Sequence, residues 1–212
     1  MSPLESLGFA LGTSFASGLN LYATVAAAGL FERFGLVHLP PSLHVLANPV
    51  IIGIAGALFI IEFIADKIPL VDSAWDAVHT FIRPPAAMLI AWSSFGSVPE
   101  VWKIGAALLA GSVALTSHGA KASARAAANT SPEPFSNWIL SFAEDAIAIF
   151  LSWLAAQHPV ITAVVVAVLV ALAILIIRAT FKFFRRAVAN VREAYRRAVA
   201  ELDGSTAGRL DG

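Results

Sequence analysis

The 212-residue chain contains no cysteine and has few charged residues. Without thiols it can form no disulfide, no thiolate metal site and no cysteine nucleophile. Charged residues make up 13% of the sequence and sum to a net charge of zero. A soluble domain carries roughly 25% charged residues, so this chain has too little charge to cover a water-facing surface. The balanced charge also argues against a nucleic-acid partner.

Long apolar stretches are what the sequence has instead. Hydrophobic residues make up 58% of it, and the mean hydropathy is +0.77. A helix needs about 20 mostly apolar residues to span a bilayer. Candidate spans cover residues 7–30, 49–66, 101–128, 135–156 and 159–177. Residues 71–95 are less apolar, and the pattern leaves open whether they span or re-enter. The stretches predict an all-α, polytopic transmembrane bundle of about six spans, with broken or re-entrant helices.

A basic segment follows the last span and predicts the orientation. Its cations are Arg178, Lys182, Arg185, Arg186, Arg192, Arg196 and Arg197. Such clusters stay in the cytoplasm, so six spans place both termini there, in a multi-pass protein of the cell (inner) membrane. We divide the chain into a membrane domain (1–178), a basic amphipathic helix (179–202) and a disordered tail (203–212). The basic helix is expected to contact anionic lipid headgroups. No oligomeric state is predicted.

Two predicted helices carry polar residues in the same pattern when one is shifted by 101 residues along the sequence. The same shift aligns Gly18 with Gly119. The polar positions are Ser17, Asn20 and Thr24 in one helix and His118, Lys121 and Arg125 in the other. Each set lies on one helical face. The pattern predicts an inverted repeat of residues 7–97 and 101–178 with a substrate site at its centre. The alternative is two unrelated helices of small residues that pack closely.

Six polar residues lie around the turn between two predicted helices, near residue 69. They are Glu62, Asp66, Asp72, Asp76, His79 and Arg83. Helical spacing gathers them into stripes, which predicts an inner mouth that binds cations or protons, or a gate. The alternative is a solvated loop with ion pairs such as Asp66 or Asp72 with Lys67 or Arg83. No ligand motif indicates a metal. No cofactor is therefore expected, and a divalent cation remains the alternative.

Glu144 and Asp145 lie inside a predicted span. An Asp at the centre of a membrane helix costs about 2.5–3.5 kcal/mol, so these carboxylates should face the protein interior. Lys121 and Arg125 on the preceding helix are the expected partners. Adjacent helical residues point about 100° apart, so one partner is not expected to serve both. We predict a substrate or proton site here, with a structural ion pair as the alternative.

Several segments, taken together, resemble a known family. They are SGLNLY at 17–22, LANP at 46–49, EFIADKIPLVD at 62–72, TFIRPPAA at 80–87, GAKASARA at 119–126 and NWILSFAED at 137–145. The chain is similar in these segments to a bacterial integral membrane family known as domain of unknown function 4126. The resemblance implies a multi-helix membrane domain and no specific activity.

The polar residues inside apolar helices favour a transporter or channel with a polar site at the midplane. Cations at that site would suit an anionic small molecule or a lipid phosphate, and the carboxylates would suit coupling to protons or cations. One alternative is a membrane-embedded enzyme acting on lipid or isoprenoid, built from Asp72, Asp76 and His79. Another is a scaffold or accessory subunit that recruits a partner through the basic segment.

Overall fold

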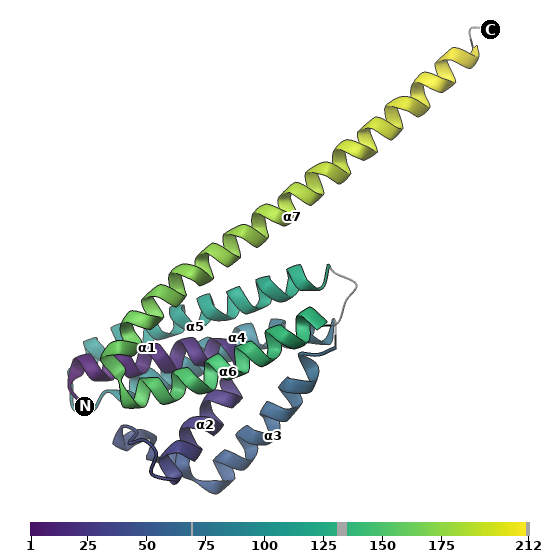
Figure 1. The fold of residues 1–212 in the computed structure, drawn as a ribbon. Coiled ribbons are helices and arrows are strands. Elements are labelled where there is room, and N and C mark those ends of the chain that lie inside the picture. The colour runs from purple at the N-terminus through teal and green to yellow at the C-terminus, as the bar shows by residue number, and fades with distance from the viewer. Residues whose placement is uncertain (69, 131–134, 211–212) are drawn as a thin grey trace.

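The computed structural model describes residues 1–68, 70–130 and 135–210, with residues 198–210 as backbone only. Its elements are α1 (Pro3–Leu19), α2 (Leu21–Arg33), the 3-10 helix η1 (Pro41–Ala47), α3 (Pro49–Ala65), α4 (Val71–Ser94), α5 (Glu100–Ala128), α6 (Phe135–Gln157) and α7 (Pro159–Leu210). The described residues contain no strand, which confirms the all-α prediction. Figure 1 shows the helices as one bundle from which α7 projects.

The distribution of side chains is the reverse of that in a water-soluble bundle. The largest side chains that are almost fully buried include Arg83, Arg125 and Lys121, whereas Ile54 and Leu89 are more than half exposed. Apolar side chains face outward when lipid is the solvent, and charges then turn inward. Two described helices, α6 and the first part of α7, are apolar and long enough to span a membrane; η1 and α3, bent by 67°, would add a third as one span. These helices are consistent with a membrane protein, and the count of six spans stays a prediction.

Helices α1 and α2 form a hairpin that enters the bundle and turns back. Gly8 of α1 packs against Pro159 at the start of α7. Gly18, ten residues later, packs against Ser117 in the interior. Helix α2 then returns to the end of the bundle where α1 began. A hydrogen bond from Gln157, at the end of α6, to the carbonyl of Leu36, just after α2, shows this. The prediction that residues 7–30 form one crossing is therefore wrong: this stretch starts and finishes at the same end of the bundle, which we call the N-terminal end.

The other helices run between the N-terminal end and the opposite end, which we call the far end. At the far end Asn129, after α5, donates a hydrogen bond to Asp72 at the start of α4. At the N-terminal end Lys103 of α5 lies over the ring of Trp92 near the end of α4. Helix α4 is continuous through Pro84 and Pro85. Residues 71–94 thus pass through the bundle as one helix and do not re-enter.

The prediction of an inverted repeat is wrong, because its two matched helices run in the same direction. An inverted repeat requires its matched helices to run oppositely. Helices α1 and α5 instead run the same way: Leu7 and Ala106 line one pocket at the N-terminal end, and Ser117 donates a hydrogen bond to the carbonyl of Phe15 further along. The shared polar pattern therefore marks two parallel helices in contact, which is the close packing of small residues given above as the alternative.

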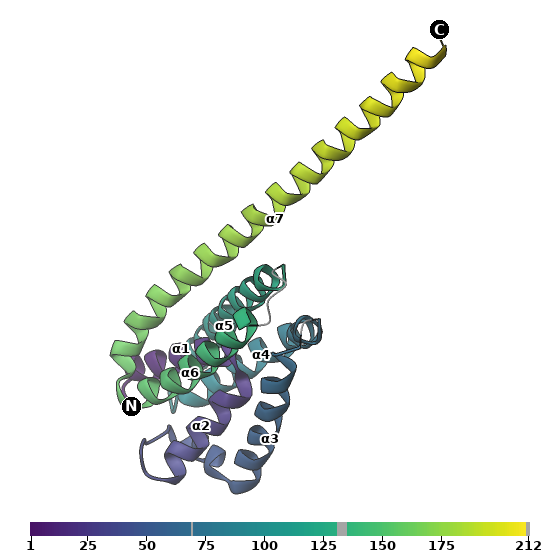
Figure 2. The ribbon, with the colours of Figure 1, turned by 45° about the vertical axis from the view of Figure 1, so that its right-hand side comes forward.

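Helix α7 begins at the N-terminal end, crosses beside α1 and α5, and continues beyond the far end (Figures 1 and 2). It has no break near residue 178, so the basic segment 179–202 extends the last membrane helix. The helix also continues to Leu210 through most of the predicted tail; residues 211 and 212 lie outside the described part. The chain therefore starts at one end of the bundle and finishes beyond the other. This arrangement is at odds with the prediction that both termini share one side of the membrane.

Candidate functional site

The break between α1 and α2 lies inside the bundle and is organised by Asn20. Its extended backbone (φ −149°, ψ 104°) ends α1 and starts α2. Its N–H donates to the carbonyl of Ala16 at 2.9 Å, and its Oδ1 accepts from the N–H of Ala23 at 2.9 Å. An Asn at this position satisfies helix-end donors that would otherwise be orphaned. The break leaves carbonyls at the end of α1 without partners inside the helix.

Two cationic side chains bind the free carbonyls at that end of α1. Arg83 of α4 donates to the carbonyl of Gly18 at 2.8 Å, and Lys121 of α5 donates to the carbonyl of Leu19 at 3.1 Å. A helix C-terminus carries partial negative charge, so cations are favourable there. The broken helix therefore contributes directly to the electrostatics of the site.

Three cations and three carboxylates form a continuous chain of ion pairs, which we call the central network. Its members are Glu62 and Asp66 of α3, Arg83 of α4, Lys121 and Arg125 of α5, and Glu144 of α6. Asp66 caps the end of α3. The network joins four helices, and all six side chains are buried.

Within the central network Lys121 and Arg125 each bridge two carboxylates at hydrogen-bond distance. Lys121 Nζ lies 3.1 Å from Glu62 Oε1 and 3.0 Å from Asp66 Oδ2. Arg125 Nη2 lies 2.8 Å from Asp66 Oδ2 and 2.6 Å from Glu144 Oε2. Because these are charge-assisted hydrogen bonds in a low-dielectric interior, they are strong and sensitive to the loss of either partner.

Arg83 completes the central network at its other end. Its Nη2 lies 2.5 Å from Glu62 Oε1, and its Nη1 is also 2.6 Å from Nδ1 of His118. A guanidinium only donates, so Nδ1 accepts and the proton of His118 is on Nε2. That nitrogen reaches the carbonyl of Asp76 at 3.0 Å and the hydroxyl of Thr80 at 2.9 Å. His118 of α5 is therefore neutral, and its two nitrogens bind Arg83 and the preceding turns of the same helix, α4.

Glu144 and Asp145 face different partners, as their angular separation predicts. Glu144 binds Arg125 at 2.6 Å and lies 3.7 Å from Lys121, so both expected partners lie beside it. Asp145 instead accepts a hydrogen bond of 2.8 Å from the Asn20 amide. Asp145 is ten residues into the 23-residue α6, so the break at Asn20 lies near half the depth of that helix.

Asp76 is buried beside the central network without joining its hydrogen bonds. Its Oδ1 is 3.8 Å from Arg83 and 4.0 Å from Lys121. Asp72 lies apart, at the far end, where it accepts hydrogen bonds from Ser73 and from Asn129. The predicted inner mouth is thus divided: Glu62, Asp66 and Arg83 join the predicted midplane residues, whereas Asp72 does not.

His79 forms a small aromatic cluster on the α2 side of α4. Its Nδ1 is 2.8 Å from the carbonyl of Trp75, so it donates, and its Nε2 accepts from the hydroxyl of Tyr22 at 3.0 Å. The ring also stacks on Trp75, with centroids 4.6 Å apart. With both nitrogens engaged, His79 has no free nitrogen for a metal or a substrate in this arrangement.

The remaining predicted residues lie on α1 and α2 near the break. Thr24 is buried and donates to the carbonyl of Asn20 at 2.7 Å, so it supports the first turn of α2. The hydroxyl of Ser17 is buried and has no hydrogen-bond partner within the described part of the chain. Neither residue contacts the central network through a hydrogen bond or ion pair given by the structure.

Two contributors were not predicted from the sequence. They are the Tyr22 hydroxyl on His79, and Lys67, whose ammonium donates to Ser141 of α6 at 3.4 Å. The ion pairs of Asp66 with Lys67 and of Asp72 with Arg83, given as the alternative, do not form. Tyr22 lies within the segment SGLNLY, the one signal that pointed towards it.

The described residues contain no group of three or more His, Asp or Glu side chains placed to hold a metal ion. The proposed enzyme residues Asp72 and His79 are each engaged elsewhere, so the enzyme alternative gains no support from the geometry.

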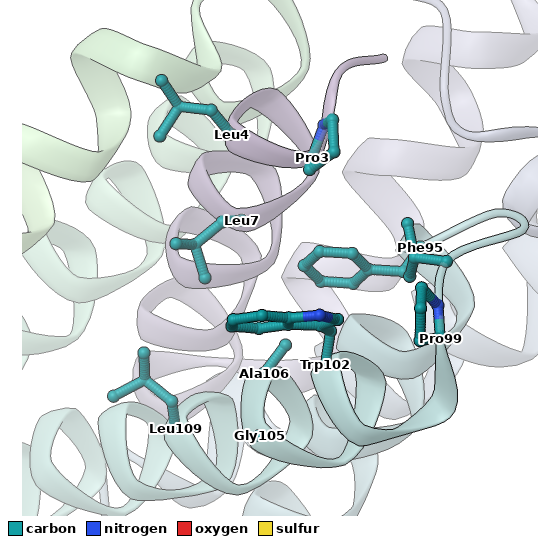
Figure 3. Close-up of a pocket in the computed structure, with 10 residues that line it drawn as sticks. Pro3, Leu4, Leu7, Phe95, Pro99, Trp102, Gly105, Ala106 and Leu109 are labelled. Carbon is teal, nitrogen blue, oxygen red and sulfur yellow. The ribbon is translucent and has the colours of Figure 1, made fainter.

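A pocket of about 650 Å³ lies at the N-terminal end, between α1 and α5 (Figure 3). Leu7, Phe95, Trp102 and Leu109 line it together with other uncharged residues. Its walls offer no charged side chain, so it cannot provide the polar chemistry predicted for the site. The central network is therefore the candidate functional site.

Comparison with known proteins adds a family and no activity. No curated protein and no solved structure gives a significant match. The family described as domain of unknown function (DUF4126) matches residues 7–179, which include the α1–α2 hairpin and the whole central network. This chain therefore belongs to the DUF4126 family of uncharacterised domains.

Proposed function

We propose that the protein is a membrane transporter whose polar site is the central network at the α1–α2 break. The observation that carries the proposal is that three cations and three carboxylates, from four helices, meet the end of a broken helix inside the bundle. Well-packed apolar residues often stabilise a protein as well as a buried ion pair or better, so a network of this size indicates a role beyond stability. Broken helices at the midplane are typical of transporter substrate sites.

The arrangement suits an anionic substrate coupled to protons. Each cation of the central network is held by carboxylates, and protonation of a carboxylate would release the cation to bind an anion. A small carboxylate or a lipid phosphate has the charge and the acceptor oxygens that Arg and Lys donors recognise. Loss of the proton would restore the ion pair and expel the anion. Arg125 is the best placed, since it bridges Asp66 and Glu144 on two different helices.

The basic extension of α7 supports a topology for this transporter. Arg185, Arg186 and Arg192 favour the cytoplasm, which would place the far end inside and the N-terminal end outside. Helices α3 to α7 would then make five crossings, and the α1–α2 hairpin would enter from outside and return. The cations of the extension would lie near anionic headgroups of the inner leaflet, where each contributes about 1 kcal/mol to attraction.

Transport currents in proteoliposomes test the proposal. The purified protein would be reconstituted and exposed to a panel of inorganic phosphate, small carboxylates and a phosphate-bearing lipid under an imposed pH gradient. We expect a current or uptake with at least one anion, abolished in Lys121→Ala and Arg125→Ala. Arg185→Gln, outside the bundle, is the matched control and should retain transport. If both Ala variants are folded and transport unchanged, the roles of these cations are rejected.

A further inference from the structure

Around the central network the buried charges do not balance, and two residues cause the imbalance there; Asp72, also buried, lies apart at the far end. In the central network Glu62, Asp66 and Glu144 are matched by Arg83, Lys121 and Arg125, so the network is neutral as an ionised set. Two more carboxylates are buried beside it. Asp76 is 4% exposed and Asp145 is 6% exposed.

Neither of these two aspartates has a cation within hydrogen-bond distance among the described residues. The nearest cation atoms to Asp76 are 3.8 and 4.0 Å away. Asp145 receives a neutral amide donor from Asn20. Each also has one buried oxygen that lacks a hydrogen-bond partner in the described part of the chain, Oδ1 of Asp76 and Oδ2 of Asp145. Glu62 and Asp66 have such an oxygen too, so the lack of a cation at hydrogen-bond distance is what sets the two aspartates apart.

Keeping Asp76 or Asp145 ionised in its buried position costs free energy. Desolvating a charge costs several kcal/mol even in real proteins, and the cost is recovered only with good ion pairs and donors. An added proton removes the charge and provides the one O–H donor that the free oxygen lacks. The three network carboxylates have their compensation already, so protons bind first at the two that do not.

We propose that Asp76 and Asp145 are the proton-binding residues of the site and that both are protonated at neutral pH in this conformation. The inference deepens the proposed function, on which its role in coupling rests: it assigns the proton as the coupling ion and the two residues that hold it before it passes to a network carboxylate and releases a cation. The central network remains ionised in the same state.

A metal cation fits the two positions less well than a proton. A bound metal ion needs several oxygen ligands at once. The broken end of α1 is unsuited to supply them, because its carbonyls at Gly18 and Leu19 already bind Arg83 and Lys121, whose positive charges would repel a metal ion. The Asn20 oxygen accepts from the Ala23 N–H and so is also engaged. A proton requires a single free oxygen, which each aspartate has.

Charged groups on the surrounding helices affect how readily each aspartate binds a proton. Those that act on Asp145 are Lys121 of α5, Glu62 and Asp66 of α3, and Lys67, which follows α3. Those that act on Asp76 are Lys121 and Arg125 of α5, Arg83 of α4 and Asp66 of α3. Arg83, Lys121 and Arg125 are committed to other carboxylates at shorter distance, so their effect on the aspartates is reduced. Lys67 donates instead to the carbonyl of Phe63 and the hydroxyl of Ser141.

Two polar side chains lie on the far-end side of Asp145. Ser141 precedes it by one turn on α6 and accepts a hydrogen bond from the half-buried Lys67. A proton that leaves Asp145 can move towards this pair when the Asn20 contact opens. Asp145 is therefore the better placed of the two to exchange with the cytoplasmic side of the proposed topology.

Infrared spectroscopy of the full-length protein in detergent tests the inference without any transport assay. Protonated carboxyl groups give C=O bands separate from those of carboxylates. At neutral pH we expect two buried carboxylic acid bands, one lost in Asp76→Asn and the other in Asp145→Asn. Asp72→Asn is the matched control: this aspartate is buried, both its oxygens accept hydrogen bonds, and the bands should stay.

A second measurement, on wild-type protein whose aspartates carry ¹³C in the side-chain carboxyl group, does not depend on the variants. Both bands should shift in the labelled wild-type protein, whether or not each variant folds. Absence of protonated bands, or bands that do not shift on labelling or that vanish in Asp72→Asn, would overturn the inference. If the bands behave as expected and no anion is transported, the protonation stands and the proposed function fails.

Discussion

Asn20 and Asp145, 125 residues apart in sequence, are joined by a hydrogen bond of 2.8 Å inside the bundle. The same Asn20 side chain uses its oxygen to cap α2 and its amide to hold Asp145. One residue thus fixes both the shape of the α1–α2 hairpin and the position of a buried carboxyl group on α6.

Replacing Asn20 separates these two roles. Asn20→Ala should lower the free energy of unfolding by about 0.5–2 kcal/mol through loss of the cap alone, with a further loss because Asp145 loses its donor. Asn20→Asp keeps the cap and places a carboxyl group against Asp145. Melting temperatures in detergent measure both effects. Asn48→Ala, which removes an exposed cap of α3, is the control and should be milder; equal losses would argue against the dual role.

Gly18→Ala tests how closely α1 approaches α5. A Cβ at Gly18 would collide with the Ser117 hydroxyl and the Ala114 backbone carbonyl, and backbone cannot move aside easily. Overpacking of this kind costs about 1–3 kcal/mol. At Gly119, its counterpart in the shared pattern, the nearest atom to a Cβ is Cδ1 of Ile177 at 3.4 Å. Gly119→Ala should therefore be tolerated in the same thermal assay, and equal stability of both variants would contradict the packing.

Arg125 and Glu144 are predicted to depend on one another. Arg125→Gln removes the cation nearest to Glu144, whose next cation, Lys121, is 3.7 Å away, and breaking a buried pair from one side costs about 3–5 kcal/mol. Glu144→Gln added to it removes the carboxylate that lost its closest partner and should restore part of the stability. A double-mutant cycle in detergent should give a coupling of about 0.5–3 kcal/mol. Purely additive losses would show that the two side chains do not interact.

The cysteine-free chain allows the topology to be tested directly. Single cysteines at Ser2, Gly96 and Ala189 can be labelled with a membrane-impermeant maleimide in intact cells. Ser2→Cys and Gly96→Cys lie at the N-terminal end and should react from outside, whereas Ala189→Cys, in the α7 extension, should react only after lysis. Labelling of positions 2 and 189 from the same side would contradict the hairpin and restore an even number of crossings.

Charge removal on the α7 extension tests its contact with lipid. We expect Arg185→Gln, Arg186→Gln and Arg192→Gln, combined, to reduce the anionic lipid that copurifies with the protein, measured by mass spectrometry. The effect should weaken as salt rises, because exposed charges are screened. The same variant should retain its melting temperature, since these arginines are exposed on a helix that has left the bundle. An unchanged amount of copurified anionic lipid would show that these arginines do not bind it.

Much of the site was predictable because buried charges in an apolar chain are rare and conspicuous. Lys121, Arg125 and Glu144 stand out within apolar helices, and desolvation requires them to turn inward and pair. Helical spacing also placed Glu62 with Asp66, and Lys121 with Arg125, on shared faces. The pairing of Arg125 with Glu144 followed from these two considerations alone.

Only the tertiary structure decided which end of the bundle each helix starts from and which carboxylate each cation meets. Polar and apolar periodicity is the same for a helix that crosses and for one that turns back at Asn20, so the sequence could not distinguish a span from a hairpin. The direction assumed for α1 relative to α5 then produced the inverted repeat. The sequence by itself determined that these charges must be buried, because lipid cannot solvate them; the fold determined their partners, because those depend on contacts between distant residues.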